Sequence, residues 1–139
     1  MPNKPAVFSI METECDGYPV VATIASNLRG YSQRNVTPWF LGFSTHLVDP
    51  DPRGLPKAGE AEELNRWEDQ IEEQIKARSK SIFVGRVTWK GNRELLYYVD
   101  NPEQVLDRLQ RLADEGSTRP FAIRCELDAE WSNVSIYVR

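Results

Sequence analysis

The sequence predicts an α+β domain in which two helices cover one face of an antiparallel sheet. Apolar residues recur every three or four positions in two segments, at 58–79 and after Asn101, as in amphipathic helices. Runs rich in β-branched and aromatic residues surround these segments, and turn-forming residues separate the runs. From residue 39 onward the order is strand, helix, strand, strand, helix, strand.

The first two strands are expected to form a hairpin before this series begins. Residues 7–14 and 19–25 flank Asp16-Gly17, a pair that suits the two positive-φ positions of a type I′ turn. Residues 26–38 are polar and include Gly30 and Pro38, so they predict a loop.

A strand at 39–48 and a helix at 58–79 come next. The segment between them, 49–56, contains three prolines, which favours a connector because proline removes backbone donors. The helix has one apolar stripe, formed by Leu64, Trp67, Ile71 and Ile75. Its other acids predict a solvated face: Glu62, Asp69, Glu72 and Glu73.

A second hairpin is predicted from strands at 81–89 and 93–99 around Gly91-Asn92, which fits a type II′ turn. A two-residue turn there would place Arg86 opposite Tyr97. In that register four residues are expected to face the helices: Phe83, Val87, Leu96 and Tyr98.

The second helix is expected to begin after Asn101 as N-cap, with Pro102 in its first position, and to end before Gly116. Strands at 120–128 and 133–138 complete the chain. The order from residue 39 is therefore the βαββαβ order of a ferredoxin-like sandwich, extended by the N-terminal hairpin. We expect one domain: hairpin and loop at 1–38, core at 39–128 and a C-terminal extension at 129–139.

Net charge and the absence of known motifs disfavour several kinds of partner and cofactor. The chain has 17 basic and 21 acidic residues and a net charge of −4, which disfavours nucleic acid or an anionic membrane as a partner. It has neither a signal-peptide pattern nor an apolar run long enough to span a membrane, so we expect a cytoplasmic protein. Cys15 and Cys125 form no metal or redox motif, and His46 is the only histidine, so no metal site or cofactor is expected.

RNA-recognition domains share the βαββαβ order. Their third strand requires a glycine where this chain has Glu94, and the run 93–99 has only part of their aromatic pattern. Nucleic acid is therefore not the expected partner.

Glu68 lies inside the apolar stripe, about 40° from Leu64 around the helix axis. A buried carboxylate needs a cation or several donors. The candidate cations on neighbouring strands are Arg86, Arg93 and Arg124. Two interpretations stay open: an ion pair that ties the helix to the sheet, or a carboxylate that lines a pocket.

The face of the sheet without helices is the expected binding surface. Mixed charge with an exposed aromatic residue suits specific protein contact. The residues predicted there are His46, Arg86, Thr88, Tyr97, Arg124 and Glu126. Asp128 and Trp131 follow the strand at 120–128 and are expected to form an Asx-type turn and an anchor for the chain terminus.

An ordered set of short motifs between residues 54 and 131 resembles the bacterial domain-of-unknown-function family 695. The residues that carry the resemblance are Gly54-Leu55-Pro56, Leu64, Glu68-Asp69, Gly85-Arg86-Val87-Thr88, Gly91, Arg93, Tyr97-Tyr98, Asp128 and Trp131. That family is similar to the regulator of ribonuclease activity B, a small acidic ferredoxin-like protein that binds and inhibits an endoribonuclease. The resemblance implies the same fold and a protein-binding role, and it implies no catalytic residues. Because it includes Arg93, it also makes this residue the first choice among the candidate partners of Glu68.

The leading hypothesis is a non-enzymatic regulatory domain, of inhibitor or immunity type, whose partner is another protein. The alternative is a small-molecule-binding domain or an enzyme that uses Glu68, Arg93 and Asp128. A pocket that joins these three groups would favour the alternative.

Overall fold

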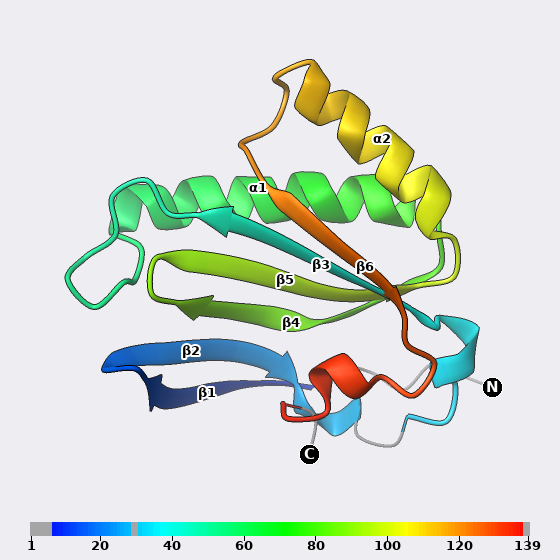
Figure 1. The fold of residues 1–139 in the computed structure, drawn as a ribbon, viewed down its shortest axis with the longest axis horizontal. Helices are drawn as coiled ribbons and strands as arrows, with labels where there is room; N and C mark the ends of the chain where they lie inside the picture. The colour runs from blue at the N-terminus through cyan, green and yellow to red at the C-terminus, as the bar shows by residue number, and fades with distance from the viewer. Residues whose placement is uncertain (1–6, 29–30, 138–139) are drawn as a thin grey trace.

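A computed structural model describes residues 7–28 and 31–137 of the chain (Figure 1). It contains six strands, two α-helices and three short 3₁₀ turns within these residues. In chain order they are β1 (Phe8–Cys15), β2 (Tyr18–Ala25), η1 (Ser26–Leu28), η2 (Arg34–Val36), β3 (Trp39–His46), α1 (Ala58–Lys76), β4 (Ser81–Trp89), β5 (Asn92–Val99), α2 (Pro102–Asp114), β6 (Ala122–Leu127) and η3 (Ser132–Val134).

The strands form one sheet in the order β1-β2-β4-β5-β3-β6, and every neighbouring pair is antiparallel. This confirms the α+β class. The N-terminal hairpin extends the sheet as predicted, because β2 pairs with β4. Its turn has positive φ at both Asp16 (55°) and Gly17 (80°), as a type I′ turn requires. β1 and β6 are the two edges of the sheet.

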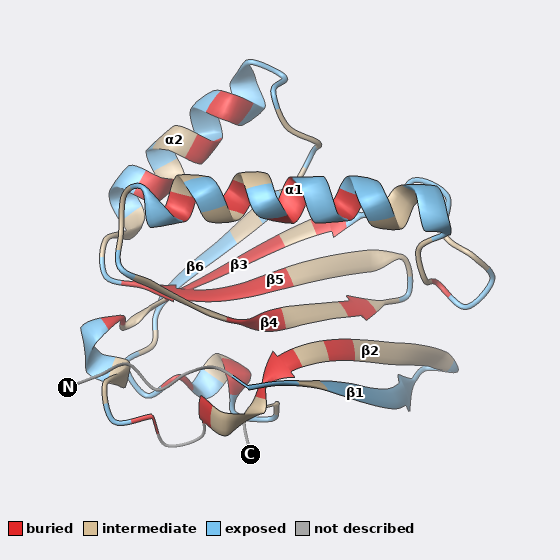
Figure 2. Ribbon diagram, turned by 180° about the vertical axis from the view of Figure 1, so that it is seen from behind, coloured by how far each residue is buried: buried red, intermediate tan, exposed pale blue. Residues whose placement is uncertain are grey.

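Both helices pack on one side of the sheet, which we call the helix face (Figure 2). The predicted stripe of α1 is buried there together with Val105, Leu109 and Leu112 of α2. The strand residues beneath them belong to one alternation set and include Leu41, Phe43, Leu95, Tyr97 and Val99. Helical periodicity therefore predicted the buried sides of both helices correctly.

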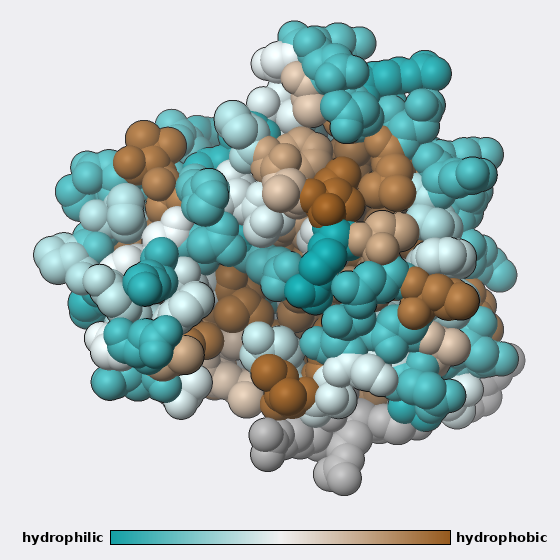
Figure 3. All heavy atoms as spheres, in the orientation of Figure 1, coloured by the Kyte–Doolittle hydropathy of each residue, from teal (hydrophilic) through white to brown (hydrophobic). Residues whose placement is uncertain are grey.

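The opposite side of the sheet, the far face, was the expected binding surface, but other parts of the chain largely cover it. Phe40, Leu96 and Tyr98 form a second core there with residues from outside the sheet. The covering residues are Leu28 and Tyr31 from the loop after β2, and Trp131 and Val134 from the segment after β6. Seen from this side in Figure 3, the exposed apolar residues form separate groups divided by polar ones.

The predicted assignment of faces in the second hairpin is wrong. Its turn is Lys90-Gly91, with φ of 49° and 78°, so Arg86 lies opposite Leu95. Arg86 and Tyr97 still share a face, but it is the helix face, while Val87 belongs to the far-face core. Apolar residues occupy both alternation sets because both faces are covered, so alternation alone could not identify the helix side.

Phe83 packs on the helix face as predicted, although the other three residues of that set do not. A β-bulge between Phe83 and Gly85 changes the alternation within β4. A side chain at Gly85 would collide with the backbone carbonyl of Thr23, so glycine allows β4 and β2 to approach each other here.

The segment after β6 is also different from the prediction, since residues 132–134 form the 3₁₀ turn η3 where a strand was expected at 133–138. Asp128 accepts hydrogen bonds from the backbone N–H groups of Ser132 (2.9 Å) and Asn133 (2.9 Å). These bonds fold the backbone back over the sheet, which prevents an extended strand.

Candidate functional site

Glu68 joins α1 to two strands through a pair of arginines. Its side chain is buried, with the residue 8% exposed. Oε1 lies 2.6 Å from Nε of Arg86 and Oε2 lies 2.7 Å from Nη1 of Arg93. The predicted ion pair is therefore confirmed, with the first-choice partner and a second one.

The two arginines have further contacts on the helix face. Nε of Arg93 donates to the Thr88 hydroxyl (2.9 Å), and the Arg86 guanidinium lies 5.5 Å from the centre of the Phe83 ring. Since each carboxylate oxygen of Glu68 already accepts a charge-assisted bond, the group acts as a connection between α1, β4 and β5.

Tyr97 was predicted on the exposed surface but is buried beneath α1, at 2% exposed. Its ring lies 5.0 Å from that of Phe83. Burial raises the pKa of Tyr97 above its ordinary value, and the nearby carboxylates of Glu72 and Glu68 raise it further, with a hydrogen bond to Glu72. Glu72 is accordingly half-buried, where a solvated position was expected.

Three of the predicted surface residues do lie on the far face: His46, Arg124 and Glu126. All three are exposed. The guanidinium of Arg124 lies 5.0 Å from the centre of the Phe40 ring, and Glu126 accepts a hydrogen bond from Nδ2 of Asn133 (2.9 Å). His46 lies at the end of β3, beside Asn92. The structure therefore divides the predicted binding surface between two faces.

Asp128 organises the segment after β6. In addition to its two backbone donors, it accepts a hydrogen bond from the Tyr98 hydroxyl (2.7 Å). Burial by itself would raise the pKa of Asp128, but the backbone N–H of Asn133, the Tyr98 hydroxyl and other donors lower it below the ordinary value. Asp128 therefore accepts backbone N–H bonds as expected, but its donors lie four and five residues further on, whereas an Asx turn uses the N–H two residues on.

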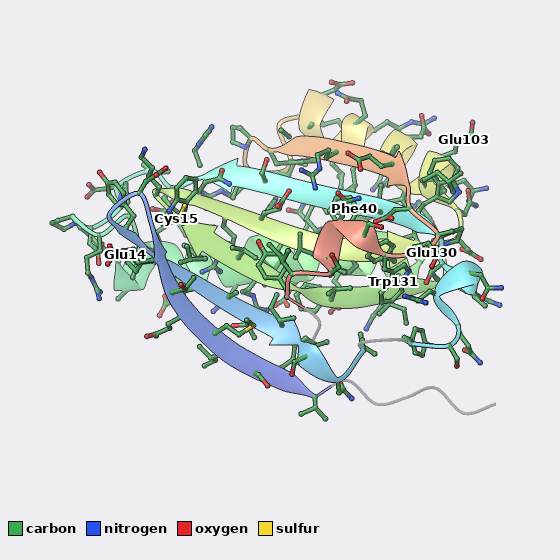
Figure 4. The ribbon with its side chains drawn as sticks, turned by 60° about the horizontal axis from the view of Figure 1, so that its bottom comes forward. Glu14, Cys15, Phe40, Glu103, Glu130 and Trp131 are labelled. Atoms are coloured by element: carbon green, nitrogen blue, oxygen red, sulfur yellow. The ribbon has the colours of Figure 1, made fainter. Side chains whose placement is uncertain are left out.

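Trp131 anchors this segment to the far face, as expected (Figure 4). Its ring stacks on Tyr98 with a centroid distance of 4.2 Å and an interplanar angle of 10°. Its Nε1 donates to the backbone carbonyl of Thr37 (3.2 Å). Asp128 and Trp131 thus hold the far-face core closed.

The alternative site made of Glu68, Arg93 and Asp128 is not assembled. Glu68 and Arg93 meet on the helix face, whereas Asp128 contacts Tyr98 on the far face. The sheet lies between them, so no single pocket can present these three groups to one ligand.

Sequence reasoning missed a second buried ion pair, between Glu60 and Arg119 (3.0 Å). Glu60 also accepts hydrogen bonds from the backbone N–H groups of Val48 and Asp49. Burial opposes ionisation, but the backbone N–H of Val48 and the Arg119 guanidinium lower the pKa of Glu60 overall. Glu60 lies in the first turn of α1, where an acidic residue is common and usually solvated, so nothing in the sequence indicates that it is buried.

Glu94 is a half-buried carboxylate on the far face that was also missed. A side chain at Gly42 would approach its Oε2 within 2.7 Å, so Glu94 lies over this glycine. Burial raises the pKa of Glu94, and the guanidinium of Arg124 opposes this effect. In the sequence, Glu94 is distinguished only by standing where an RNA-recognition domain has glycine.

The remaining candidate for a functional site is β1, an exposed edge strand of the sheet. Four alternate residues of β1 have side chains on the helix-face side of the sheet, opposite β2 residues in the antiparallel ladder. We name this set the β1 edge: Phe8, Ile10, Glu12 and Glu14. Phe8 is 45% exposed and Ile10 is 73% exposed. Figure 4 shows β1 as the outermost strand, with Glu14 and Cys15 at its end near the turn.

The backbone of the β1 edge also points outward. Cys15 and Tyr18 close a two-residue turn, and such a closing pair exchanges both of its backbone hydrogen bonds. Odd-numbered residues therefore direct their N–H and C=O groups toward β2, in agreement with the Val7 N–H, which bonds Oδ1 of Asn27 (2.8 Å). The even-numbered residues of the β1 edge direct theirs away from the sheet, where no strand of the described chain pairs with them.

Sequence pattern could not identify this edge, because a hairpin strand has the same sequence features whether or not another strand covers it.

Among the residues that the structure describes, neither a metal site nor a membrane-spanning helix is found. No group of three or more histidine, cysteine or acidic side chains is arranged to hold a metal. No helix among them has the length and apolar character needed to cross a membrane.

Comparisons with known proteins give the family. Searches of curated proteins and of solved structures found no match. The model of a family of unknown function, DUF695, matches residues 9–137, which include all six strands except Phe8, both helices and the segment of Asp128 and Trp131. The chain therefore belongs to the DUF695 family.

Proposed function

We propose that this chain is a protein-binding domain of regulatory type, which captures an extended segment of a partner protein at the β1 edge. The single observation that carries the proposal is that β1 has both unpaired outward-facing backbone groups and exposed apolar side chains. Incoming strands bind such edges through main-chain hydrogen bonds, and side chains of alternate residues supply specificity.

Natural sheets guard free edges with charged residues, proline, bulges or short strands. β6, at the other edge, has six residues, and its far-face side chains Arg124 and Glu126 are both charged. β1 also carries two charged residues, Glu12 and Glu14, but it has eight residues, no proline and no bulge. Its first half exposes Phe8, Ile10 and Met11, whereas β6 exposes one large apolar residue, Leu127. The contrast supports β1 as the edge kept available for a partner.

The proposal includes a ferredoxin-like core and a relation to the regulator of ribonuclease activity B. The strand order β4-β5-β3-β6 and the positions of α1 and α2 on one face support the first point. For the second, support comes from the acidic composition and the family resemblance. A bacterial cytoplasm is the proposed location, which suits two exposed free cysteines, Cys15 and Cys125.

Replacement of Ile10 by proline tests the proposal. The Ile10 N–H points away from β2, so Ile10→Pro removes a donor for an incoming strand while the β1–β2 ladder keeps its bonds. Affinity capture from a lysate of the source organism, with quantitative mass spectrometry, compares wild type, Ile10→Pro and Ile10→Thr. We expect at least one protein whose recovery falls about tenfold with Ile10→Pro.

The threonine variant is the matched control, since it keeps the backbone donor at residue 10, and we expect it to retain most of the recovery. Circular dichroism of each variant checks that the fold is unchanged. Equal recovery of every captured protein by wild type and folded Ile10→Pro would contradict binding at this edge.

A further inference from the structure

We propose that the segment bound at the β1 edge runs antiparallel to β1 and carries two basic residues at alternate positions followed by two apolar residues at alternate positions. This inference rests on the proposed function and specifies the chemistry of the partner. Antiparallel pairing is chosen because every neighbouring pair in this sheet is antiparallel and such ladders are slightly the more stable kind.

The acidic half of the β1 edge has charge without compensation. Glu12 and Glu14 are exposed, and no ion pair joins either of them to a cation of the described chain. Their cross-strand neighbours on β2 are Val21 and Pro19, neither of which is charged. An incoming strand would place its alternate side chains directly opposite these carboxylates, where opposite charges are favourable.

The apolar half of the β1 edge borders a cavity between α1 and the start of β4. The Phe8 ring lies 5.7 Å from that of Phe83. A cavity of about 290 Å³ beside them is lined also by Leu28, Ile82, Ser81 and Tyr97, with Glu72 and Lys76 of α1. A large apolar side chain placed opposite Phe8 would contact the exposed part of this ring, as cross-strand neighbours do.

The two halves together define the order of the bound segment. In an antiparallel arrangement its first side chain on this face lies opposite Glu14, the next opposite Glu12, and the last two opposite Ile10 and Phe8. The pattern is basic, any, basic, any, apolar, any, apolar, read from the N-terminus.

A second copy of this chain fits the β1 edge less well. Antiparallel self-pairing centred on Ser9 brings Phe8 of one copy opposite Ile10 of the other, which suits the apolar half. It places Glu12 and Glu14 of each copy beyond Val7, the first described residue of the other copy, so no described side chain of that copy lies opposite them. A basic and apolar segment from another protein satisfies both halves, so we choose it as the occupant.

Synthetic peptides test the inference directly. The probe is a fluorescein-labelled, amidated peptide of sequence TKTKTITFT, and the matched peptide TETETITFT reverses its charges. Fluorescence anisotropy gives the dissociation constants with wild-type protein at about 50 mM and about 500 mM salt. We expect the lysine peptide to bind at least about tenfold more tightly at low salt, and this ratio to shrink at high salt.

Variants connect the preference to the proposed residues. Glu12→Gln with Glu14→Gln should remove the preference for the lysine peptide. Glu103→Gln with Glu115→Gln makes the same change of net charge at α2, far from β1 in Figure 4, and should preserve it. Ile10→Pro should abolish binding of both peptides.

The outcomes separate this inference from the proposed function. Equal binding of the two peptides by wild type, or a lysine preference that survives loss of both edge carboxylates, overturns the basic pattern. If neither peptide binds while Ile10→Pro still loses a captured protein, the partner has different chemistry and strand capture stands. A concentration-dependent dimer that Ile10→Pro abolishes would make a second copy the occupant and overturn the inference.

Discussion

Glu68 of α1 and Arg93 of β5 are 25 residues apart in the chain and joined by an ion pair of 2.7 Å, with the Arg93 side chain 12% exposed. Arg86 of β4 binds the other oxygen of the same carboxylate at 2.6 Å. A single acidic side chain therefore holds the long helix on a hairpin whose strands otherwise present an apolar surface to it.

Loss of this carboxylate should destabilise the protein. Glu68→Leu leaves two cations beneath α1 without their partner, and removal of one member of a buried pair costs about 3–5 kcal/mol. We expect a clearly lower urea midpoint, measured by circular dichroism. Glu73→Leu, on the exposed side of the same helix, should change the free energy of unfolding by less than about 0.5 kcal/mol.

Glu72 is unsuitable as that control, because its carboxylate contacts the buried Tyr97 hydroxyl. Equal midpoints for Glu68→Leu and Glu73→Leu would show that the ion pair contributes nothing to stability.

The ionised carboxylate of Asp128 should stabilise the fold at neutral pH, and this stabilisation should be lost in acid. Since its native pKa lies below the unfolded value of about 3.9, its contribution is present above the unfolded pKa and disappears as pH falls through the native pKa. Asp128→Asn should therefore unfold at lower urea than wild type at pH 7, and the two midpoints should converge below about pH 4. A difference that is constant with pH would mean that charge at this position does not matter.

Ionisation of Glu94 should destabilise the fold, in contrast to ionisation of Asp128. Burial raises its native pKa, so its contribution is present below the unfolded pKa and is lost as pH rises through the native pKa. Glu94→Gln removes the buried charge with little change of shape. We expect it to raise the urea midpoint at pH 7 and to reduce the dependence of wild-type stability on pH in the range above the unfolded pKa.

Glu126→Gln is the matched control for Glu94, because Glu126 lies on the same face but is exposed. It should have little effect on the midpoint. A Glu94→Gln variant that is less stable than wild type at pH 7 would show that the ionised carboxylate makes a favourable contact at this position.

The sequence alone determined those features whose causes are local. Asp16-Gly17 specified a hairpin because few residues adopt two consecutive positive φ angles. The spacing of Leu64, Trp67 and Ile71 specified the buried side of α1 because helix geometry relates spacing directly to direction. The same periodicity placed Glu68 among apolar neighbours, and the cost of a bare buried charge then required an arginine.

Tertiary structure alone decided which face of each strand met the helices and which edge stayed free. Leu96 and Tyr97 are both buried, on opposite sides, because α1 covers one face and the segment of Trp131 covers the other. Alternation cannot distinguish two covered faces, since each presents apolar residues. Exposure of Phe8 and Ile10 likewise follows from the position of β1 at the end of the strand order, which depends on pairings between distant parts of the chain.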